Sequence, residues 1–180
     1  MKKFELTSET KINIFGKKLF RIKALISFGD VEAGETGGWV EKEGNVNQSG
    51  DAWVYGDAMV YGNAMVSGDA MVYGNAMVSG DARVYGDAMV SGDARVYGDA
   101  MVSGDARVYG DADYTTIHGF GTQFRTTTFF RCKDKKVRVA CGCFFGTIPE
   151  FREQVKNTRK GKIAEEYLMI ADLMEKHFEK

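Results

Sequence analysis

The sequence predicts a mainly β protein in which short parallel strands stack as a coil between two non-repetitive flanks. Glycine recurs at every sixth residue from Gly44 to Gly110, twelve times without a break. Each six-residue unit reads Gly-[Asp/Asn]-Ala-x-Val-[Tyr/Ser], which is long enough for one short strand and one corner. Such a unit cannot bury its apolar face alone, so successive units must coil and stack on one another.

The order of residues within the unit predicts which side chains face inward. Side chains alternate along a strand, so Ala and Val share one face, while position x and the Tyr or Ser share the other. Gly and the following Asp or Asn form the corner, because Gly tolerates positive φ and Asx side chains bond their own turn backbone. Ala and Val therefore form the expected core.

An aliphatic residue followed four positions later by a small one, repeated every six residues, resembles the hexapeptide-repeat family of left-handed β-helices. In that family three hexads make one triangular coil, which implies about four coils between Gly38 and Ala112 and a prism roughly 19 Å long. Tyr and Ser alternate from Tyr61 to Tyr109. A triangular coil of three hexads stacks Tyr above Ser, whereas a two-sided coil of two hexads would stack Tyr on Tyr. We favour the triangular coil.

The flanks divide the chain into three expected parts: a cap over residues 1–37, the repeats over 38–113, and an α+β module over 114–180. In the cap, Lys11–Phe15 and Leu19–Leu25 read as a β-hairpin whose apolar residues should cover the open end of the coil. In the module, residues 126–139 read as a second hairpin. Thr147 and Glu150 form a capping-box pattern that should open a helix through about Val155, and a second helix should run from about Ile163 to Phe178.

Both flanks also carry a resemblance. Phe20–Leu25, Phe28–Val31 and Gly37–Glu41 look like a cap found ahead of Tyr-Gly-Asp-Ala-type repeats in phage and prophage proteins. Arg138–Phe144, with Gly146-Thr147 and Glu150-Phe151, is similar to a module that ends many such proteins. The resemblance covers nearly the whole chain, but it carries no established activity and no catalytic residues to transfer.

Composition excludes several classes of protein. The 180 residues include no apolar run near the roughly 18 residues needed to span a bilayer, and Glu5 and Glu9 interrupt any secretory signal at the N-terminus. Three cysteines, an odd number, fit reduced thiols better than a disulfide framework. We therefore expect a cytoplasmic protein that does not contact membranes.

Charge is segregated along the chain. Residues 44–112 carry nine Asp against three Arg, whereas residues 114–180 carry 13 basic and 8 acidic residues. An acidic rod with about one carboxylate per 2 Å would resemble duplex DNA, which carries about one phosphate charge per 1.7 Å. Asp is also ordinary at a Gly-Asp corner, and Asn63 and Asn75 serve the same purpose without charge. DNA mimicry is therefore an alternative, and direct DNA binding is not expected.

Catalytic and metal-binding residues are sparse. His118 and His177 are the two histidines, so a three-His metal site cannot form within one chain. His118 follows the repeats and would be the base of a hexapeptide-repeat acyltransferase, the enzymatic alternative. Cys132, Cys141 and Cys143 could supply three ligands of a zinc site, but a lone CxC pair favours buried thiols instead. We predict no cofactor and no catalytic residue.

The outward positions of the repeats carry the predicted binding surface. Met and Tyr there would expose a soft apolar surface that is unusual for a monomer and suits a partner. The candidate interface residues are Trp53, Tyr55, Met59, Tyr61, Met65, Met71, Tyr73, Met77, Arg83, Arg95 and Arg107. Since proteins of this coil type commonly form trimers, one expected partner is the same chain.

Together these observations predict a non-enzymatic phage or prophage interaction protein, a rigid oligomeric solenoid that binds a host factor such as a defence protein and can inhibit it. One alternative is a sponge for small nucleotide signals, which would need intersubunit pockets lined by Arg or Tyr. The acidic DNA mimic and the acyltransferase are the others.

Overall fold

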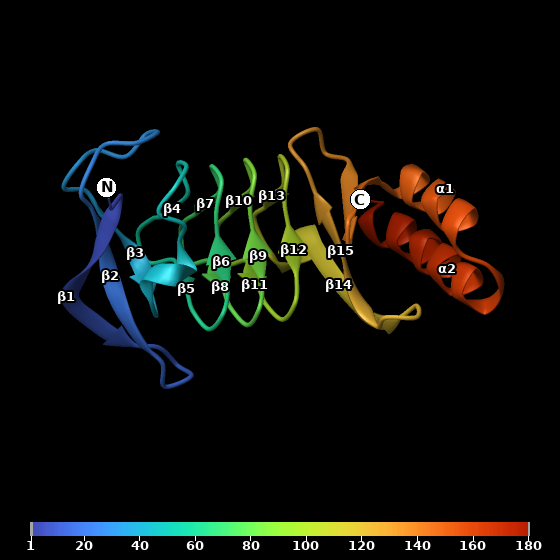
Figure 1. The fold of residues 1–180 in the computed structure, drawn as a ribbon, viewed down its shortest axis with the longest axis horizontal. Helices are drawn as coiled ribbons and strands as arrows, with labels where there is room; N and C mark the ends of the chain where they lie inside the picture. Colours follow the sequence, from blue (N-terminus) through green and yellow to red (C-terminus); the bar gives the residue numbers. More distant parts are fainter. Residues whose placement is uncertain (1, 180) are drawn as a thin grey trace.

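The computed structural model describes residues 2–179 as three parts in a row (Figure 1). A long hairpin and its loops form the N-terminal end, short stacked strands form the middle, and a small sheet with two helices forms the C-terminal end. Neither helix in these residues has the length and apolar character that a membrane crossing requires.

The middle part is a β-solenoid of ten two-residue strands, each formed by position x and Val of one repeat. They are β4 (Trp53–Val54), β5 (Met59–Val60), β6 (Met65–Val66), β7 (Met71–Val72), β8 (Met77–Val78), β9 (Arg83–Val84), β10 (Met89–Val90), β11 (Arg95–Val96), β12 (Met101–Val102) and β13 (Arg107–Val108). Every strand pairs in parallel with the strand 18 residues away, as Val60 pairs with Val78. The 18-residue triangular coil is therefore confirmed, and the two-sided coil is wrong.

Three sheets line the three sides of the solenoid. The first has the order β1-β2-β3-β5-β8-β11, the second β13-β10-β7-β4, and the third β12-β9-β6. The repeat Ala residues from Ala52 to Ala106 and the Val residues from Val54 to Val108 are fully buried between the sheets, which confirms the predicted inner face. At the corners the chain turns at glycines such as Gly80, whose φ is +69° and where a Cβ would lie 2.9 Å from the backbone nitrogen of Gly98. Only glycine fits so close a contact between coils.

The Asx side chains of the corners stack in three rows along the solenoid. In two rows an Asn amide donates to the Asp of the next coil, from Asn63 to Asp81 and from Asn75 to Asp93, both at 3.1 Å. The densest row holds four of the nine aspartates, Asp51, Asp69, Asp87 and Asp105, which lie 18 residues apart. Strands stack at about 4.8 Å, so this row carries one carboxylate per coil.

The N-terminal cap extends the first sheet. It contains β1 (Phe4–Ile12), β2 (Lys18–Ala24), β3 (Thr36–Val40) and a short 3-10 helix η1 (Glu43–Asn45). β1 and β2 form an antiparallel hairpin, β2 pairs with β3, and β3 pairs in parallel with β5. Phe4 and Ile22 are buried in the solenoid core, as expected for a cap.

The predicted hairpin was wrong in two respects. Its first strand begins at Phe4 rather than Lys11 and ends before the turn. Ile12, Ile14 and Phe15 do not cover the coil but are exposed at the hairpin tip, with Ile14 at 83 %. The tip instead lies beside the first sheet, where the Phe15 ring is 6.2 Å from that of Tyr61.

The C-terminal module has its own sheet and its own core. Its elements are η2 (Asp111–Asp113), β14 (Tyr114–Phe120), β15 (Arg125–Arg131), β16 (Val137–Cys141), β17 (Phe144–Thr147), α1 (Ile148–Thr158) and α2 (Gly161–Phe178). The four strands are antiparallel in chain order. Both predicted helices and the hairpin formed by β15 and β16 are confirmed, including the capping box, in which the Glu150 amide donates to Thr147 Oγ1 at 3.3 Å. Strands β14 and β17 were not predicted.

Candidate binding groove on the solenoid

Trp53, a predicted interface residue, is fully buried and faces no solvent. It occupies position x of the first complete repeat, where its ring packs edge-on against Phe4 and Phe28, with centroid distances of 5.8 and 5.3 Å. The N-terminal cap covers this outer position, so the prediction that Trp53 is a binding residue is wrong. Trp53 instead joins the cap to the coil.

Tyr61 is also buried, because the hairpin lies over it. It packs in a small cluster with Leu19, Trp39 and Met59, and its ring lies 6.2 Å from that of Phe15 at the hairpin tip. Tyr55 and Tyr73 are half-buried. The tyrosines of the early coils are therefore buried or half-buried and do not form the exposed surface that was predicted.

The methionines do not form one apolar stripe. Met59 and Met77 lie on the first sheet, Met71 on the second and Met65 on the third, because consecutive repeats turn from one side of the solenoid to the next. Met65 alone of these four is classed as exposed, at 43 %, and the other three are half-buried. A continuous methionine surface, as the sequence pattern implied, is not present in residues 2–179.

The three predicted arginines differ in exposure and in hydrogen bonding. Arg83 and Arg95 are exposed. Arg107 Nη1 donates to the backbone carbonyls of Asp87 and Ala106, at 2.9 and 2.8 Å, so its guanidinium is held against the coil. Arg107 therefore stabilises the corner of the coil, and its guanidinium is not free to bind a partner.

Three of the predicted residues, Tyr61, Met77 and Arg95, come together in a groove of about 630 Å³ on the first sheet. The hairpin tip forms one wall with Phe15 and Lys17. Strand β11 and the residue after it form the other wall with Arg95 and Tyr97. We call this feature the tip groove. Phe15 and Tyr97 are each 63 % exposed, so two aromatic rings are available at its edges.

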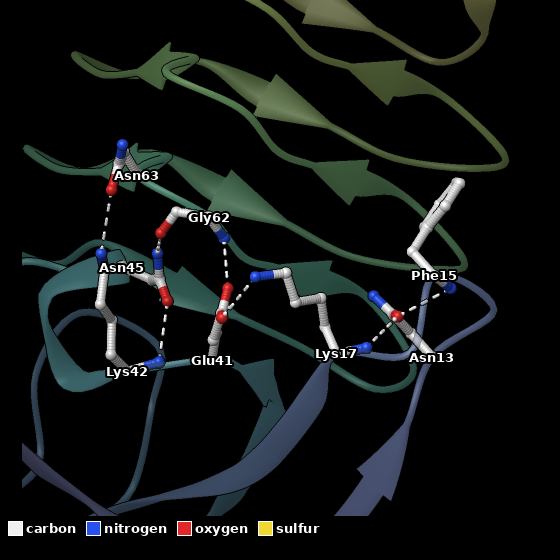
Figure 2. Close-up of polar contacts among 8 residues, drawn as sticks. All are labelled: Asn13, Phe15, Lys17, Glu41, Lys42, Asn45, Gly62 and Asn63. Atoms are coloured by element: carbon white, nitrogen blue, oxygen red, sulfur yellow. Dashed lines mark hydrogen bonds and ion pairs between the residues drawn. The ribbon is translucent and has the colours of Figure 1, made fainter.

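The hairpin tip is held by an Asn turn, which Figure 2 shows beside Lys17. The Asn13 Oδ1 atom accepts hydrogen bonds from the backbone amides of Phe15 and Lys17, each at 3.0 Å. The backbone amide of Asn13 donates to the backbone carbonyl of Lys17 at 2.9 Å. Asx side chains stabilise turns in this way, so the directions of Phe15 and Lys17 are fixed locally.

Glu41 connects the tip to the solenoid (Figure 2). Its carboxylate accepts the Gly62 backbone amide at 2.7 Å and the Lys17 ammonium at 3.2 Å. The Gly62 hydrogen bond is the main cause that lowers the pKa of Glu41, and the positive charge of Lys17 adds to it. The carboxylate therefore stays ionised and keeps Lys17 at the groove.

Asn45, whose side chain is fully buried, also connects the first coil to the next one (Figure 2). Its side chain accepts the Lys42 amide at 2.9 Å and donates to the carbonyls of Gly62 and Ala64, at 3.2 and 2.8 Å. The two bonds to Gly62 and Ala64 join the first, incomplete coil to the next one, and the bond from Lys42 closes the turn of η1. Asn45 and Glu41 thus fix the coil that carries one wall of the tip groove.

The groups that line the tip groove suit binding. The floor is Met77 and Ser79, the walls carry aromatic rings, and the cations are Arg95 and Lys17, of which Lys17 is paired with Glu41. Arg95 is absent from the ion pairs found among residues 2–179, and the lining contains no carboxylate, imidazole or thiol. An apolar or aromatic group beside an anionic one matches this surface.

Sequence reasoning missed Phe15, Lys17 and Tyr97 as site residues. The hairpin was assigned to cover the coil end, so its tip received no binding role. One signal was present: Asn13 and Gly16 enclose Ile14 and Phe15, and apolar residues within a turn cannot pack into the hairpin itself. Tyr97 shares its repeat position with Tyr61, and only the position of the tip tells them apart.

The cysteines and His118 do not meet at one site. Cys132 is buried in the solenoid core, where burial raises the pKa of its thiol to about 12, while Cys143 is exposed in a turn. The interpretation of buried thiols holds for Cys132 and is wrong for Cys143. No group of three potential metal ligands occurs among residues 2–179. His118 is exposed on β14, with its Nδ1 atom 3.0 Å from Thr126 Oγ1.

Comparison with known proteins supports the repeat architecture. A family model described as YdcK Beta solenoid repeat matches six overlapping segments, residues 52–68, 58–73, 64–80, 70–84, 82–98 and 94–110. These lie within the solenoid, and the two flanks fall outside the match. No curated protein matches the chain. The chain is therefore a β-solenoid repeat protein, similar in its repeats to that family.

Proposed function

We propose that this chain is a non-enzymatic interaction protein that uses its solenoid as a rigid arm and binds a partner protein in the tip groove. The supporting observation is the groove itself, in which exposed Phe15 and Tyr97 flank an apolar floor beside Lys17 and Arg95. The partner would present an acidic segment that contains an aromatic or aliphatic side chain.

The physical properties of the groove favour affinity. Its walls are fixed by the coil hydrogen bonds and the Asn13 turn, so binding orders few side chains and costs little entropy. Aromatic residues and arginine are the residue types that contribute most to protein interfaces. Its volume of about 630 Å³ accommodates one or two anchoring side chains rather than a whole helix.

The resemblance of both flanks to phage and prophage proteins supports a biological setting for this proposal. In that setting the partner is a host factor, such as a defence protein, in the host cytosol, and binding inhibits it. We also propose that the chain forms a homotrimer of the hexapeptide-repeat type, with the third sheet and its exposed Met65 as the contact between copies. Light scattering on the purified protein measures this assembly.

A matched pair of tyrosine variants tests the groove. Tyr97 and Tyr109 occupy the same repeat position and are 63 and 55 % exposed, but Tyr109 follows β13 on the second sheet, away from the groove. Tagged wild-type protein, Y97E and Y109E would be used to capture partners from a bacterial lysate, with quantification by mass spectrometry. We expect one stoichiometric partner that Y97E loses at least tenfold and Y109E retains. Equal capture by the two variants contradicts the proposal.

A second candidate function is the binding of a small nucleotide signal. The observation in its favour is that Tyr97, Phe15 and Arg95 lie at one groove within a single chain, which could stack a base and bind a phosphate. Thermal shift with cyclic dinucleotides would show a stabilisation that Arg95→Gln abolishes and Arg83→Gln, an exposed arginine on the third sheet, preserves. The absence of any shift excludes this candidate and leaves the protein partner.

A further inference from the structure

A second pocket lies in the C-terminal module, separate from the tip groove. It has a volume of about 240 Å³ and is enclosed between the sheet, the end of α1 and the side of α2. Its apolar wall contains Phe144 and Phe151, whose ring centroids are 5.5 Å apart. Phe151 also packs edge-on against Tyr167 at 5.8 Å. The pocket is therefore built from three aromatic rings of the module core.

Two arginines, Arg125 and Arg159, line this pocket, and no carboxylate does. The arginine ion pairs among residues 2–179 involve Arg21, Arg131, Arg138 and Arg152 instead. Arg159 Nη1 donates to the Thr158 carbonyl at 3.2 Å, which holds the guanidinium at the end of α1 and leaves its other N–H groups free. Arg125 also borders a shallow hollow that contains Asp99, without an ion pair to it. The pocket thus holds two guanidinium groups without a matching anion.

Tyr167 contributes a hydroxyl to the lining of the same pocket. It lies in the pocket and donates to the Phe120 carbonyl at 3.2 Å. Burial raises the pKa of Tyr167, as does the neighbouring Cys141, whereas the positive charges of Arg159 and Arg125 lower it. The pocket lining therefore combines two arginines with a tyrosine hydroxyl.

Gly142, in the turn between β16 and β17, lies against the Arg125 guanidinium. Its φ is +61°, and a Cβ at this position would collide with the Arg125 guanidinium. The side chain of Arg125 therefore lies across a turn that has no side chain of its own. Gly142 itself borders the shallow hollow, and Arg125 lines both that hollow and the pocket that Arg159 also lines.

We propose that this pocket binds a small organic oxyanion with an aromatic ring, such as an aryl phosphate or an aryl carboxylate. The oxyanion would lie between Arg125 and Arg159, since guanidinium groups bind phosphate and carboxylate oxygens with paired hydrogen bonds. The ring would pack against Phe144 and Phe151. This site is independent of the tip groove and of any partner that binds there.

The test uses phenyl phosphate as the probe, titrated into the full-length protein and followed by calorimetry and by NMR of module amides. Benzoate tests the carboxylate form of the ligand, inorganic phosphate tests the oxyanion alone, and benzyl alcohol tests the ring alone. We expect saturable binding of phenyl phosphate, with inorganic phosphate and benzyl alcohol each at least tenfold weaker. Stronger binding of benzoate than of phenyl phosphate would assign the site to carboxylates within the same proposal.

Arginine variants provide the second part of the test. Arg125→Gln and Arg159→Gln should each weaken phenyl phosphate binding at least tenfold, while Arg83→Gln on the solenoid serves as the matched control and should not change it. Arg159→Lys keeps the charge but loses the planar fork, so it should fall between wild type and Arg159→Gln. Unchanged melting temperatures show that the variants are folded. Absence of saturable binding, or equal loss in the Arg83→Gln control, overturns the proposal.

Discussion

The two ends of the solenoid are closed in different ways. At the N-terminal end, β3 continues the first sheet, and the backbone amides of Trp39 and Glu41 donate to the carbonyls of Ala58 and Val60 at 3.0 and 3.1 Å. At the C-terminal end, the module sheet stays separate from the three solenoid sheets, and an isolated bridge between Ala106 and Cys132 links it to the last coil, where the Lys133 amide donates to the Asp105 carbonyl at 3.0 Å. There the Thr128 hydroxyl accepts the Met101 amide at 3.0 Å, in place of a strand.

This difference shows which end can define a site on the solenoid. The N-terminal hairpin shares backbone hydrogen bonds with the coils, so its tip keeps a fixed position beside the first sheet. The C-terminal module inserts Phe130 into the solenoid core but keeps a separate core around Phe129, Tyr167 and Met174. The first end forms the tip groove with the solenoid, and the second end carries a pocket of its own.

The largest expected effect comes from the aromatic residue that fills each end. Trp53→Ala removes a fully buried ring beside Phe4 and Phe28, and should cost about 3–5 kcal/mol of unfolding free energy. Phe130→Ala, also fully buried, should cost a similar amount at the other end. Chemical denaturation measures both. Hydrogen exchange should show that Trp53→Ala exposes the hairpin amides while Phe130→Ala leaves them protected; the reverse pattern would refute the comparison.

A smaller effect should follow from removing the buried amide of the first coil. Asn45→Ala leaves the Lys42 amide and the carbonyls of Gly62 and Ala64 without their partner, which should cost about 2–3 kcal/mol. Asn63→Ala, at the exposed position one coil later, is the control and should cost about 0.5 kcal/mol. Equal costs in urea denaturation would show that Asn45 holds no special position.

The Glu41 contact predicts a pH dependence confined to the N-terminal end. Because the pKa of Glu41 is lowered from its usual value of 4.5 in the folded state, its stabilisation is complete above that pH and is lost as the pH falls through the lower folded value. Wild-type stability should therefore decrease more steeply than that of Glu41→Gln as the pH falls below 4.5. Parallel curves for the two proteins would mean that the carboxylate does not hold the tip.

The smallest effect concerns the row of four aspartates. Asp87→Asn should place an amide where it can donate to Asp105, as Asn63 donates to Asp81, and should remove one like charge from the row. We expect a stabilisation of about 0.5 kcal/mol. Asn75→Asp, which removes the 3.1 Å hydrogen bond to Asp93, should destabilise by a similar amount. A stabilising Asn75→Asp would argue that the carboxylates have a bound counterion.

The repeat could be predicted because one physical requirement determines the residue type at each position of the unit. Ala and Val recur where the core needs small apolar residues, and Gly recurs where the corner needs positive φ, so the six-residue period predicts the coil directly. The capping box at Thr147 and Glu150 is similarly local. Strands β14 and β17 were missed although their Tyr, Thr and Phe residues favour strands, because a glycine, Gly119 or Gly146, interrupts each short pattern.

The candidate site could be predicted only in part. Tyr61, Met77 and Arg95 were identified as outer residues, but an 18-residue coil places neighbouring repeats on different sides, and the hairpin covers some of them. Trp53 and Tyr61 are buried for that second reason. Which outer residues stay free depends on where the hairpin tip lies, and this long-range contact leaves no local signal in the sequence.

Hydrogen exchange of the hairpin tip tests the central claim that the tip groove is preformed. The backbone amides of Phe15 and Lys17 both donate to Asn13 Oδ1. The Glu41 amide donates to the Val60 carbonyl, and the Gly62 amide donates to the Glu41 carboxylate. If the groove is preformed, the Phe15 and Lys17 amides should be protected at neutral pH together with those of Glu41 and Gly62. Exchange of the tip amides at the rate of an unfolded peptide, with the solenoid still protected, would contradict a fixed groove.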